Sequence, residues 1–267
     1  MDKMTTSIIA ATGLILLFSL EAFVSKDFRN SFKASSLFRN ISYIITSLIV
    51  LVLLGEVSSV VKLTLGDNTL KIHKIPLLDY IGCFLFAELL NWFSHYIKHS
   101  GWLWRLHYPH HIDKRYTVLL TTHTHALDVI CSGVIIGLAM SLVGFSIEAI
   151  NTYYLFYTLA NTYQHSSLNF SLGFLDYIIV SPRYHRIHHS KSHRGNYGST
   201  ITFWDIVFST AYWPKRYDVK KDIGIVDNGE PFGFAKEMLY FLKIDPKKSS
   251  TGNRLALKLI VILKNLT

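Results

Sequence analysis

Long, nearly uncharged apolar runs dominate the N-terminal part of this sequence. Four of them cover residues 5–20, 41–61, 75–97 and 126–150, and a shorter, tyrosine-rich run covers residues 151–165. A helix needs about 20 apolar residues to cross the hydrocarbon core of a bilayer. Only 17% of the residues are charged, against about 25% in an ordinary soluble domain. The pattern predicts an all-α fold, an integral membrane helical bundle with about four to five spans.

The first run fits either a signal peptide or a retained span. A signal peptide has a basic start, an apolar core of about 7–15 residues and a cleavage site of small residues. Here Lys3 is the only basic residue before the run, and no such cleavage site follows Leu20. We therefore expect a retained transmembrane helix.

Lysine and arginine are unevenly distributed over the loops between these runs. The first and third loops carry four each, the second carries three, the turn near residues 146–151 carries none, and the region from residue 161 onward carries fifteen. Basic residues favour loops on the cytoplasmic side. We therefore expect the first loop, the third loop and the C-terminal region on that side, and the N-terminus outside.

The net charge of +9 also raises the question of nucleic-acid binding. The basic loops of a membrane protein account for this charge. The sequence has neither zinc-finger spacing nor an aromatic–basic RNA-binding motif. We therefore expect a membrane protein with no nucleic-acid partner.

Histidine is concentrated in one part of the chain. Twelve of the thirteen histidines lie between residues 95 and 193, and most of them fall in the motifs HYIKH, HYPHH, NTYQH and HRIHH. The predicted orientation places residues 95–125 and 165–193 on the same, cytosolic side of the membrane, so these motifs can meet. We therefore expect a cytosolic, histidine-rich helical cap on the bundle. The motif histidines are His95, His99, His107, His110, His111, His165, His185, His188 and His189.

The spacing of these histidines has a geometric meaning. On a helix, positions i, i+3 and i+4 share a face, so H-x-x-x-H and H-x-x-H-H direct two or three imidazoles toward one point. Proline favours the first turn of a helix, so Pro109 predicts that His107 precedes a helix carrying His110 and His111. Nine imidazoles are too many for one ion and predict two metal ions with four to five ligands each. Imidazole binds iron, zinc, copper and nickel, so the spacing alone does not select the metal.

Four further residues are candidates for water-bridged or supporting roles: Asn161, His125, Asp128 and His193. In THTHALD, the i, i+2 spacing does not place His123 and His125 on one helical face. Asp128, three residues after His125, is placed to accept the N–H of that ring. A direct metal role for His123 or His125 stays open.

HYIKH, HYPHH and HRIHH resemble the histidine boxes of the fatty acid hydroxylase / sterol desaturase superfamily. The segments NYG at residues 196–198 and WDIVFST at residues 204–210 resemble the pattern that follows the last box. The resemblance covers residues 79–212. It implies a multi-helix membrane protein whose nine boxed histidines, on the cytosolic side, bind two iron ions. Such a centre uses O2 and two electrons to hydroxylate, desaturate or demethylate lipids.

Two segments depart from the superfamily pattern. Asn161 stands where many members have a histidine, which implies a weaker ligand or a coordination position open to O2. In THTHALD, His123 and Ala126 replace the arginine and proline of the R-x-H-P-L-E segment of many members. The resemblance therefore does not fix the role of His125.

The expected function is hydroxylation or desaturation of a lipid of the sterol or fatty acyl type, taken from the bilayer. The sequence shows no haem-binding or ferredoxin domain, so we expect a separate electron donor of the haem-protein or ferredoxin type. We expect a transmembrane hairpin over residues 1–75 and a catalytic core over 76–215. A cytosolic tail over 216–267 then carries an amphipathic helix near 255–266. The alternatives are a membrane zinc-dependent hydrolase and a non-catalytic metal-binding membrane protein.

Overall fold

The computed structural model describes residues 3–65, 75–168, 172–214, 223–225, 231 and 233–242. Within these residues the protein is all-helical, as predicted, and its β-type contacts are two isolated bridges, Ile179–Ile201 and Ser190–Ile223. The helix expected near residues 255–266 and most of the predicted tail lie outside the described residues.

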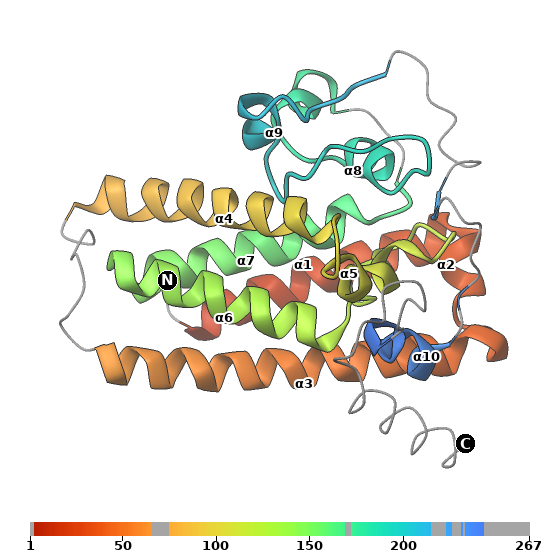
Figure 1. The fold of residues 1–267 in the computed structure, drawn as a ribbon, viewed down its shortest axis with the longest axis horizontal. Coiled ribbons are helices and arrows are strands. Elements are labelled where there is room, and N and C mark those ends of the chain that lie inside the picture. The colour runs from red at the N-terminus through yellow and green to blue at the C-terminus, as the bar shows by residue number, and fades with distance from the viewer. Residues whose placement is uncertain are drawn as a thin grey trace, which may run out of the picture.

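Long helices form a bundle that runs along the longest axis of the molecule (Figure 1). They are α1 (Lys3–Val24), α3 (Ala34–Leu65), α4 (Cys83–Lys98), α6 (Ala126–Val143) and α7 (Ile147–Gln164). A π-helical segment, η2 (Leu78–Gly82), leads directly into α4. Helix α3 packs against α6, α1 packs against α7, and α4 packs against both α6 and α7.

The fourth predicted run, residues 126–150, is two helices in the structure. Gly144 adopts the left-handed conformation with φ 83°, which glycine reaches without a steric penalty, and this ends α6. The hydroxyl of Ser146 then accepts a hydrogen bond from the amide of Ala149 and caps α7. The two helices therefore form a tight hairpin, and the last residues of the predicted run belong to α7.

Membrane-spanning character is strongest in α6. Of the described helices, α6 alone is both long and apolar enough to cross a bilayer, while shorter apolar stretches cover Ile8–Val24 in α1 and Ser36–Val50 in α3. Between α4, α6 and α7 lies a core of buried residues that includes Cys83, Met140 and Tyr153.

The shorter helices form a cap around the end of the bundle where α4 and α7 finish, with α8 and α9 above α4 in Figure 1. They are α2 (Lys26–Asn30), α5 (Trp104–His111), η3 (Val118–Thr121), η4 (Gly173–Tyr177), α8 (Pro182–His188), α9 (Phe203–Val207), α10 (Phe234–Met238) and η5 (Tyr240–Leu242). The connections between them are irregular, so their backbone amides need acceptors outside helices and strands.

Buried carboxylates supply some of these acceptors. Glu21 of α1 accepts hydrogen bonds from the amides of Val118 (2.8 Å) and Ser167 (2.6 Å). Glu88 of α4 accepts one from the amide of Thr200 (2.9 Å). Each carboxylate thereby fixes a loop of the cap to a helix of the bundle.

A buried ionic cluster fixes α10 to α3. The Nε of Arg39 donates to both carboxylate oxygens of Glu237 at 3.0 Å, and its Nη1 donates to Asp113 at 2.7 Å. The hydroxyl of Tyr43 also donates to Glu237, at 2.5 Å. Glu237 is fully buried, so this attraction acts with little screening by water.

Removing one partner of this cluster leaves the other charges buried without full compensation. We expect Glu237→Ala to lower the free energy of unfolding by about 3–5 kcal/mol, measured as a lower melting temperature in detergent. The exposed neighbour on the same helix provides the control, and Lys236→Ala should melt within about 0.5 kcal/mol of the wild type. Equal melting of the two variants would show that the cluster does not stabilise α10.

Candidate metal centre

The nine motif histidines converge at one place in the structure, where they form two groups. Within each group, one ring nitrogen from every member lies within 4.8 Å of the others. The five-histidine group contains His95, His99, His107, His111 and His188. The four-histidine group contains His110, His165, His185 and His189.

The division between the groups cuts across the sequence motifs. On α5, His107 and His111 belong to the five-histidine group and His110 to the four-histidine group. On α8 the arrangement is reversed, because the first and last histidines of HRIHH join the four-histidine group and His188 joins the other. Each H-x-x-H-H motif therefore serves both groups, whereas the spacing had suggested a single point.

The prediction that His107 precedes the helix was wrong. Helix α5 begins at Trp104, and Pro109 lies inside it. A proline within a helix removes only the hydrogen bond of its own nitrogen and crowds the preceding turn. The flanking bonds remain, from the amide of His107 to Leu103 (3.3 Å) and from the amide of Ile112 to Tyr108 (3.2 Å). The burial of its side chains from Leu106 to His111 stabilises the rest of the helix.

Contacts between ring nitrogens fit a shared ion in each group. The Nε2 of His165 lies 3.1 Å from that of His110 and 3.0 Å from that of His185, which lies 3.2 Å from that of His189. One such contact, at 3.2 Å, also joins two members of the five-histidine group. Two nitrogens that bind one ion at about 2.1 Å and at a right angle are ~3.0 Å apart. The donor set therefore fits metal ions.

Backbone carbonyls hold two rings of the five-histidine group in orientation. The Nδ1 of His95 lies 3.0 Å from the carbonyl oxygen of Tyr197, and the Nδ1 of His188 lies 2.8 Å from that of Gly195. A proton on Nδ1 leaves Nε2 with a free lone pair, and both Nε2 atoms are buried without a hydrogen-bond partner. Metal-binding histidines are oriented in this way.

Burial keeps the imidazoles neutral. It lowers the pKa of His110, His185 and His189 well below the usual value, and the neighbouring rings lower it further. Neutral imidazole is the form that binds a metal ion. These side chains are therefore in the correct protonation state at neutral pH.

Asn161 orients a histidine of the four-histidine group. Its carbonyl oxygen lies 2.7 Å from the Nδ1 of His165, and its side-chain oxygen accepts a hydrogen bond from the Nε2 of Gln164 at 2.6 Å. The group that contacts His165 is the main-chain carbonyl of Asn161. Every residue type has such a carbonyl, so the sequence did not predict this contact.

Asp128 has a different partner from the predicted one. Its carboxylate lies 3.2 Å from the Nδ1 of His107 and 2.6 Å from the ammonium of Lys98. His125 instead caps α6, and its Nε2 lies 2.8 Å from the carbonyl oxygen of Met238. Both nitrogens of the His125 ring thus have partners other than Asp128, and the Asp128 carboxylate orients His107 instead.

The other two histidines of the region lie outside both groups. His123 packs on Tyr43, with ring centroids 4.7 Å apart, and its Nδ1 lies 3.7 Å from Asp113. His193 stacks on Tyr212 at 4.3 Å and lines a cavity next to the five-histidine group.

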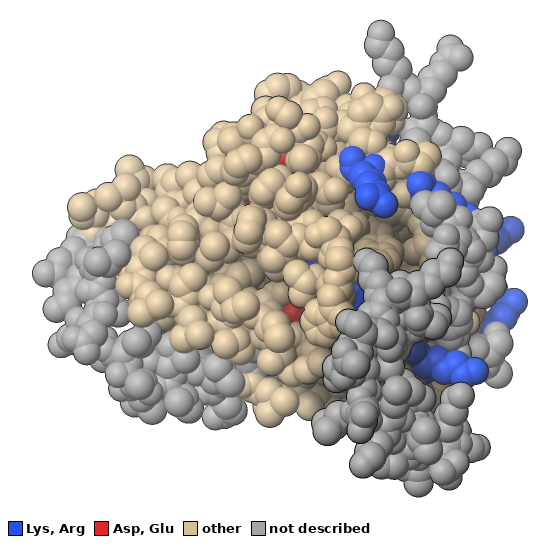
Figure 2. Space-filling model, viewed as in Figure 1, with Lys and Arg blue, Asp and Glu red and all other residues tan. Residues whose placement is uncertain are grey.

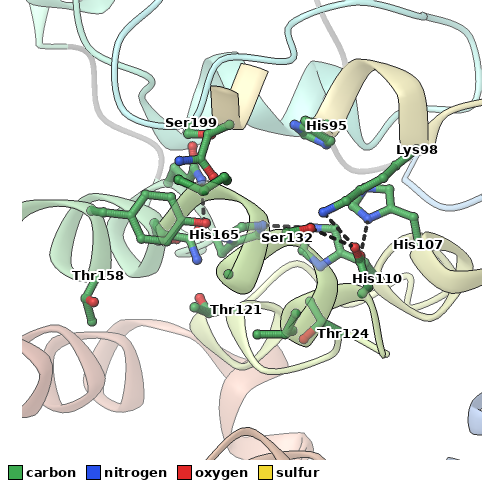
Figure 3. A pocket seen from close by; sticks show the side chains of 18 of the residues that line it. His95, Lys98, His107, His110, Thr121, Thr124, Ser132, Thr158, His165 and Ser199 are labelled. Carbon is green, nitrogen blue, oxygen red and sulfur yellow. Dashed lines mark hydrogen bonds and ion pairs between the residues drawn. The ribbon is translucent and has the colours of Figure 1, made fainter. Parts of the chain in front are cut away.

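Two cavities adjoin the centre. The first, of about 230 Å³, lies between α4, α6 and α7, and Figure 3 shows histidines of both groups in its wall. The second, of about 150 Å³, is lined by His99, His111 and His188 together with Lys191 and Arg194. The centre is therefore reached from two directions.

Comparison with known proteins shows which family has a sequence similar to this part of the chain. The sequence profile of the family described as fatty acid hydroxylase matches residues 80–210, which include all nine histidines. Residues 80–210 therefore belong to the fatty acid hydroxylase family. The match agrees closely with the extent of the resemblance, residues 79–212.

Two relatives of this chain have names that refer to lipids. Alkylglycerol monooxygenase of Caenorhabditis elegans is 26% identical over 157 residues, which are 57% of this chain and 30% of that protein. Ornithine lipid hydroxylase OlsE of Rhizobium tropici is 29% identical over 143 residues, which are 52% of this chain and 43% of that protein. The chain thus spans less than half of the length of either relative. No solved structure matches it.

Asp205 organises the segment that carries the two carbonyls that orient His95 and His188. Its fully buried carboxylate accepts five hydrogen bonds of 2.6–2.9 Å. The donors are the amides of Tyr197 and Gly198, the indole of Trp92 and the hydroxyls of Tyr184 and Thr210. Two of the donor amides lie in the NYG segment, and Asp205 lies in WDIVFST. Hydrogen bonds to this carboxylate therefore join the two segments.

The bond between Asp128 and His107 makes a testable contribution to metal binding. Asp128→Asn keeps the shape of the side chain but removes the charge that orients and polarises the ring. We expect a 10–100-fold lower affinity for iron at the five-histidine group, measured by competition with a chelator. Glu148→Gln, an exposed change at the start of α7, is the control and should leave the affinity unchanged. Equal metal affinities of Asp128→Asn and the wild type would show that Asp128 does not support metal binding.

Proposed function

We propose that this protein is an integral membrane oxidoreductase that hydroxylates a lipid, using O2 and two iron ions held by the two histidine groups. The observation that carries the proposal is the convergence of nine imidazoles into groups of five and four. The family match and two relatives named as lipid oxygenases support the reaction class. The lipid is of the kind that enters from the bilayer.

The iron centre would supply the insertion of one oxygen atom of O2 into a C–H bond. The other oxygen atom leaves as water, which requires two electrons and two protons. The protein positions the metal ligands. Asp128 and the carbonyls of Gly195 and Tyr197 orient histidine rings, and the packed helices exclude bulk water. The cavity between α4, α6 and α7 adjoins both groups and receives the carbon to be oxidised.

Surface character supports the membrane part of the proposal. Large apolar side chains are exposed on the bundle helices, among them Ile15, Leu16, Leu48, Leu53 and Ile135. On the face shown in Figure 2, lysine and arginine gather at one end and most of the remainder is uncharged. A soluble protein rarely exposes such apolar area.

The proposed topology rests on the apolar runs of the sequence and on the distribution of lysine and arginine, and the exposed apolar surface supports it. It has about four to five spans, with the histidines on the cytoplasmic side. The proposed organisation keeps a transmembrane hairpin at 1–75, a catalytic core at 76–215 and a cytosolic tail at 216–267.

The electrons come, in this proposal, from a separate haem protein or ferredoxin. The second cavity supports this assignment because it opens beside His99, His111 and His188 and carries Lys191 and Arg194. Positive charge at this mouth favours the approach of an acidic donor.

The test uses the full chain purified in detergent. We expect about two irons per chain, and incubation with membrane lipids, a reduced ferredoxin and isotopically labelled O2 should add one labelled oxygen atom to a lipid. One zinc per chain with lipid hydrolysis would favour the zinc hydrolase instead. Bound metal without any consumption of O2 or lipid would favour the non-catalytic alternative.

A further inference from the structure

We propose that the cavity between α4, α6 and α7 binds the polar, uncharged backbone of the lipid beside the metal centre. Hydroxylation then falls on a carbon close to that polar group rather than in the middle of the hydrocarbon chain. This inference rests on the proposed function and names the substrate class for the same site.

The cavity wall changes from polar to apolar with distance from the histidines. Along α6, Asp128 and Ser132 line it nearest the centre, and Ile136 lines it one turn further away. Each step of four residues is about 6 Å along the helix axis. A lipid lying along α6 therefore meets polar groups first and apolar groups beyond them.

Helix α7 shows the same gradient in the opposite chain direction. Gln164, Asn161 and Thr158 line the cavity at the end nearest His165. Tyr157 and Tyr154 follow further from the centre. Figure 3 shows Thr158, Thr121 and Ser132 around the same space, with His165 and His110 beside it. The antiparallel helices α6 and α7 therefore both place their polar cavity-lining residues at the end nearest the metal centre.

Gln164 points to the chemistry of the ligand. It is 2% exposed, its Nε2 is occupied by Asn161, and its Oε1 is buried without a hydrogen-bond partner. The Oγ1 of Thr121, in the same cavity wall, is also buried and unpartnered. A buried carbonyl oxygen without a donor is unfavourable. A ligand with a hydroxyl or amide N–H would satisfy it.

The charges of the cavity favour an uncharged ligand. Besides the histidines, the charged residues of the wall are Lys98 and Asp128, and they pair at 2.6 Å. Asp128 is also bound to His107. Neither charge is left to balance a phosphate or a quaternary amine. The ligand class is therefore a long-chain lipid with a hydroxyl, ether or amide group at the start of its chain.

The experiment compares hexadecyl glyceryl ether with its dimethyl ether, which has the same chain and ether oxygen but no hydrogen-bond donor. Equilibrium binding to the iron-loaded full chain is measured with radiolabelled probes. We expect the glyceryl ether to bind about tenfold more tightly. Gln164→Met, similar in size, should reduce the difference to about twofold, while Ser42→Ala, on α3 outside the cavity wall, should keep it.

The position of oxidation gives a second readout. With labelled O2 and a reduced donor, the new oxygen on the hexadecyl chain should lie at one of the first carbons next to the ether. Equal binding of the two probes, or oxidation in the distal half of the chain, would overturn the inference. Selective binding that depends on Gln164, without oxidation of any lipid, would support the inference while contradicting the proposed function.

Discussion

Replacing His185 with alanine is expected to reduce the iron content from about two to about one per chain and to abolish detectable turnover. His185 contacts two other members of the four-histidine group through its Nε2. Its loss leaves three ligands there, and we expect at least a ~100-fold lower affinity, because even supporting residues contribute 10–100-fold. Iron is measured by elemental analysis of folded protein.

His188→Ala is the matched comparison. It lies on the same helix, three residues away, but belongs to the five-histidine group. Four ligands remain there, so we expect more iron to be retained than in His185→Ala, although turnover is still lost. His193→Ala, outside both groups, should keep both irons. Identical iron content in all three variants would contradict the division into two groups.

Asp205→Asn is expected to lower the free energy of unfolding by about 3–5 kcal/mol, because the five donors of this carboxylate are buried and the amide presents its own N–H groups to some of them. The segment that Asp205 holds carries the carbonyls that orient His95 and His188. The surviving folded protein should therefore release iron from the five-histidine group first.

Melting temperature and iron release to a chelator measure these two effects of Asp205→Asn separately. Asp27→Asn changes an exposed aspartate of α2 and should alter neither measurement. A variant that melts early but keeps both irons at wild-type affinity would limit Asp205 to a structural role.

The histidines were predictable from the sequence, but their partition was not. Helical spacing identified eight of the nine candidates, because it depends only on local geometry. His165 was included because NTYQH resembles an H-x-x-x-H motif with Asn161 in the place of its first histidine. Which group receives His110 or His188 depends on how α5 and α8 are rotated against each other, and that is set by tertiary packing. Backbone carbonyls are also invisible to such reasoning, because every residue has one. The roles of Gly195, Tyr197 and Asn161 came only from the fold.

The predicted all-helical architecture was confirmed for the described residues, and the errors in helix ends have a simple cause. The turn expected near residues 146–151 lies slightly earlier, between Val143 and Ile147, because Gly144 ends α6 and Ser146 caps α7, and hydropathy does not register either effect. Glu88 lies within the third apolar run and Glu21 directly follows the first, and a carboxylate buried at such a position needs hydrogen-bond donors. The donors were loop amides, which no pattern identifies.

The position of α8 has a consequence for biogenesis. It supplies His188 to one group and His185 to the other, with His189 at its end, and it is the last of the ligand-bearing elements in chain order. A growing chain therefore has all five bundle helices synthesised before either group is complete. Neither group can therefore bind a metal ion with its full set of ligands until α8 has been synthesised, and a chain truncated before α8 has neither group complete.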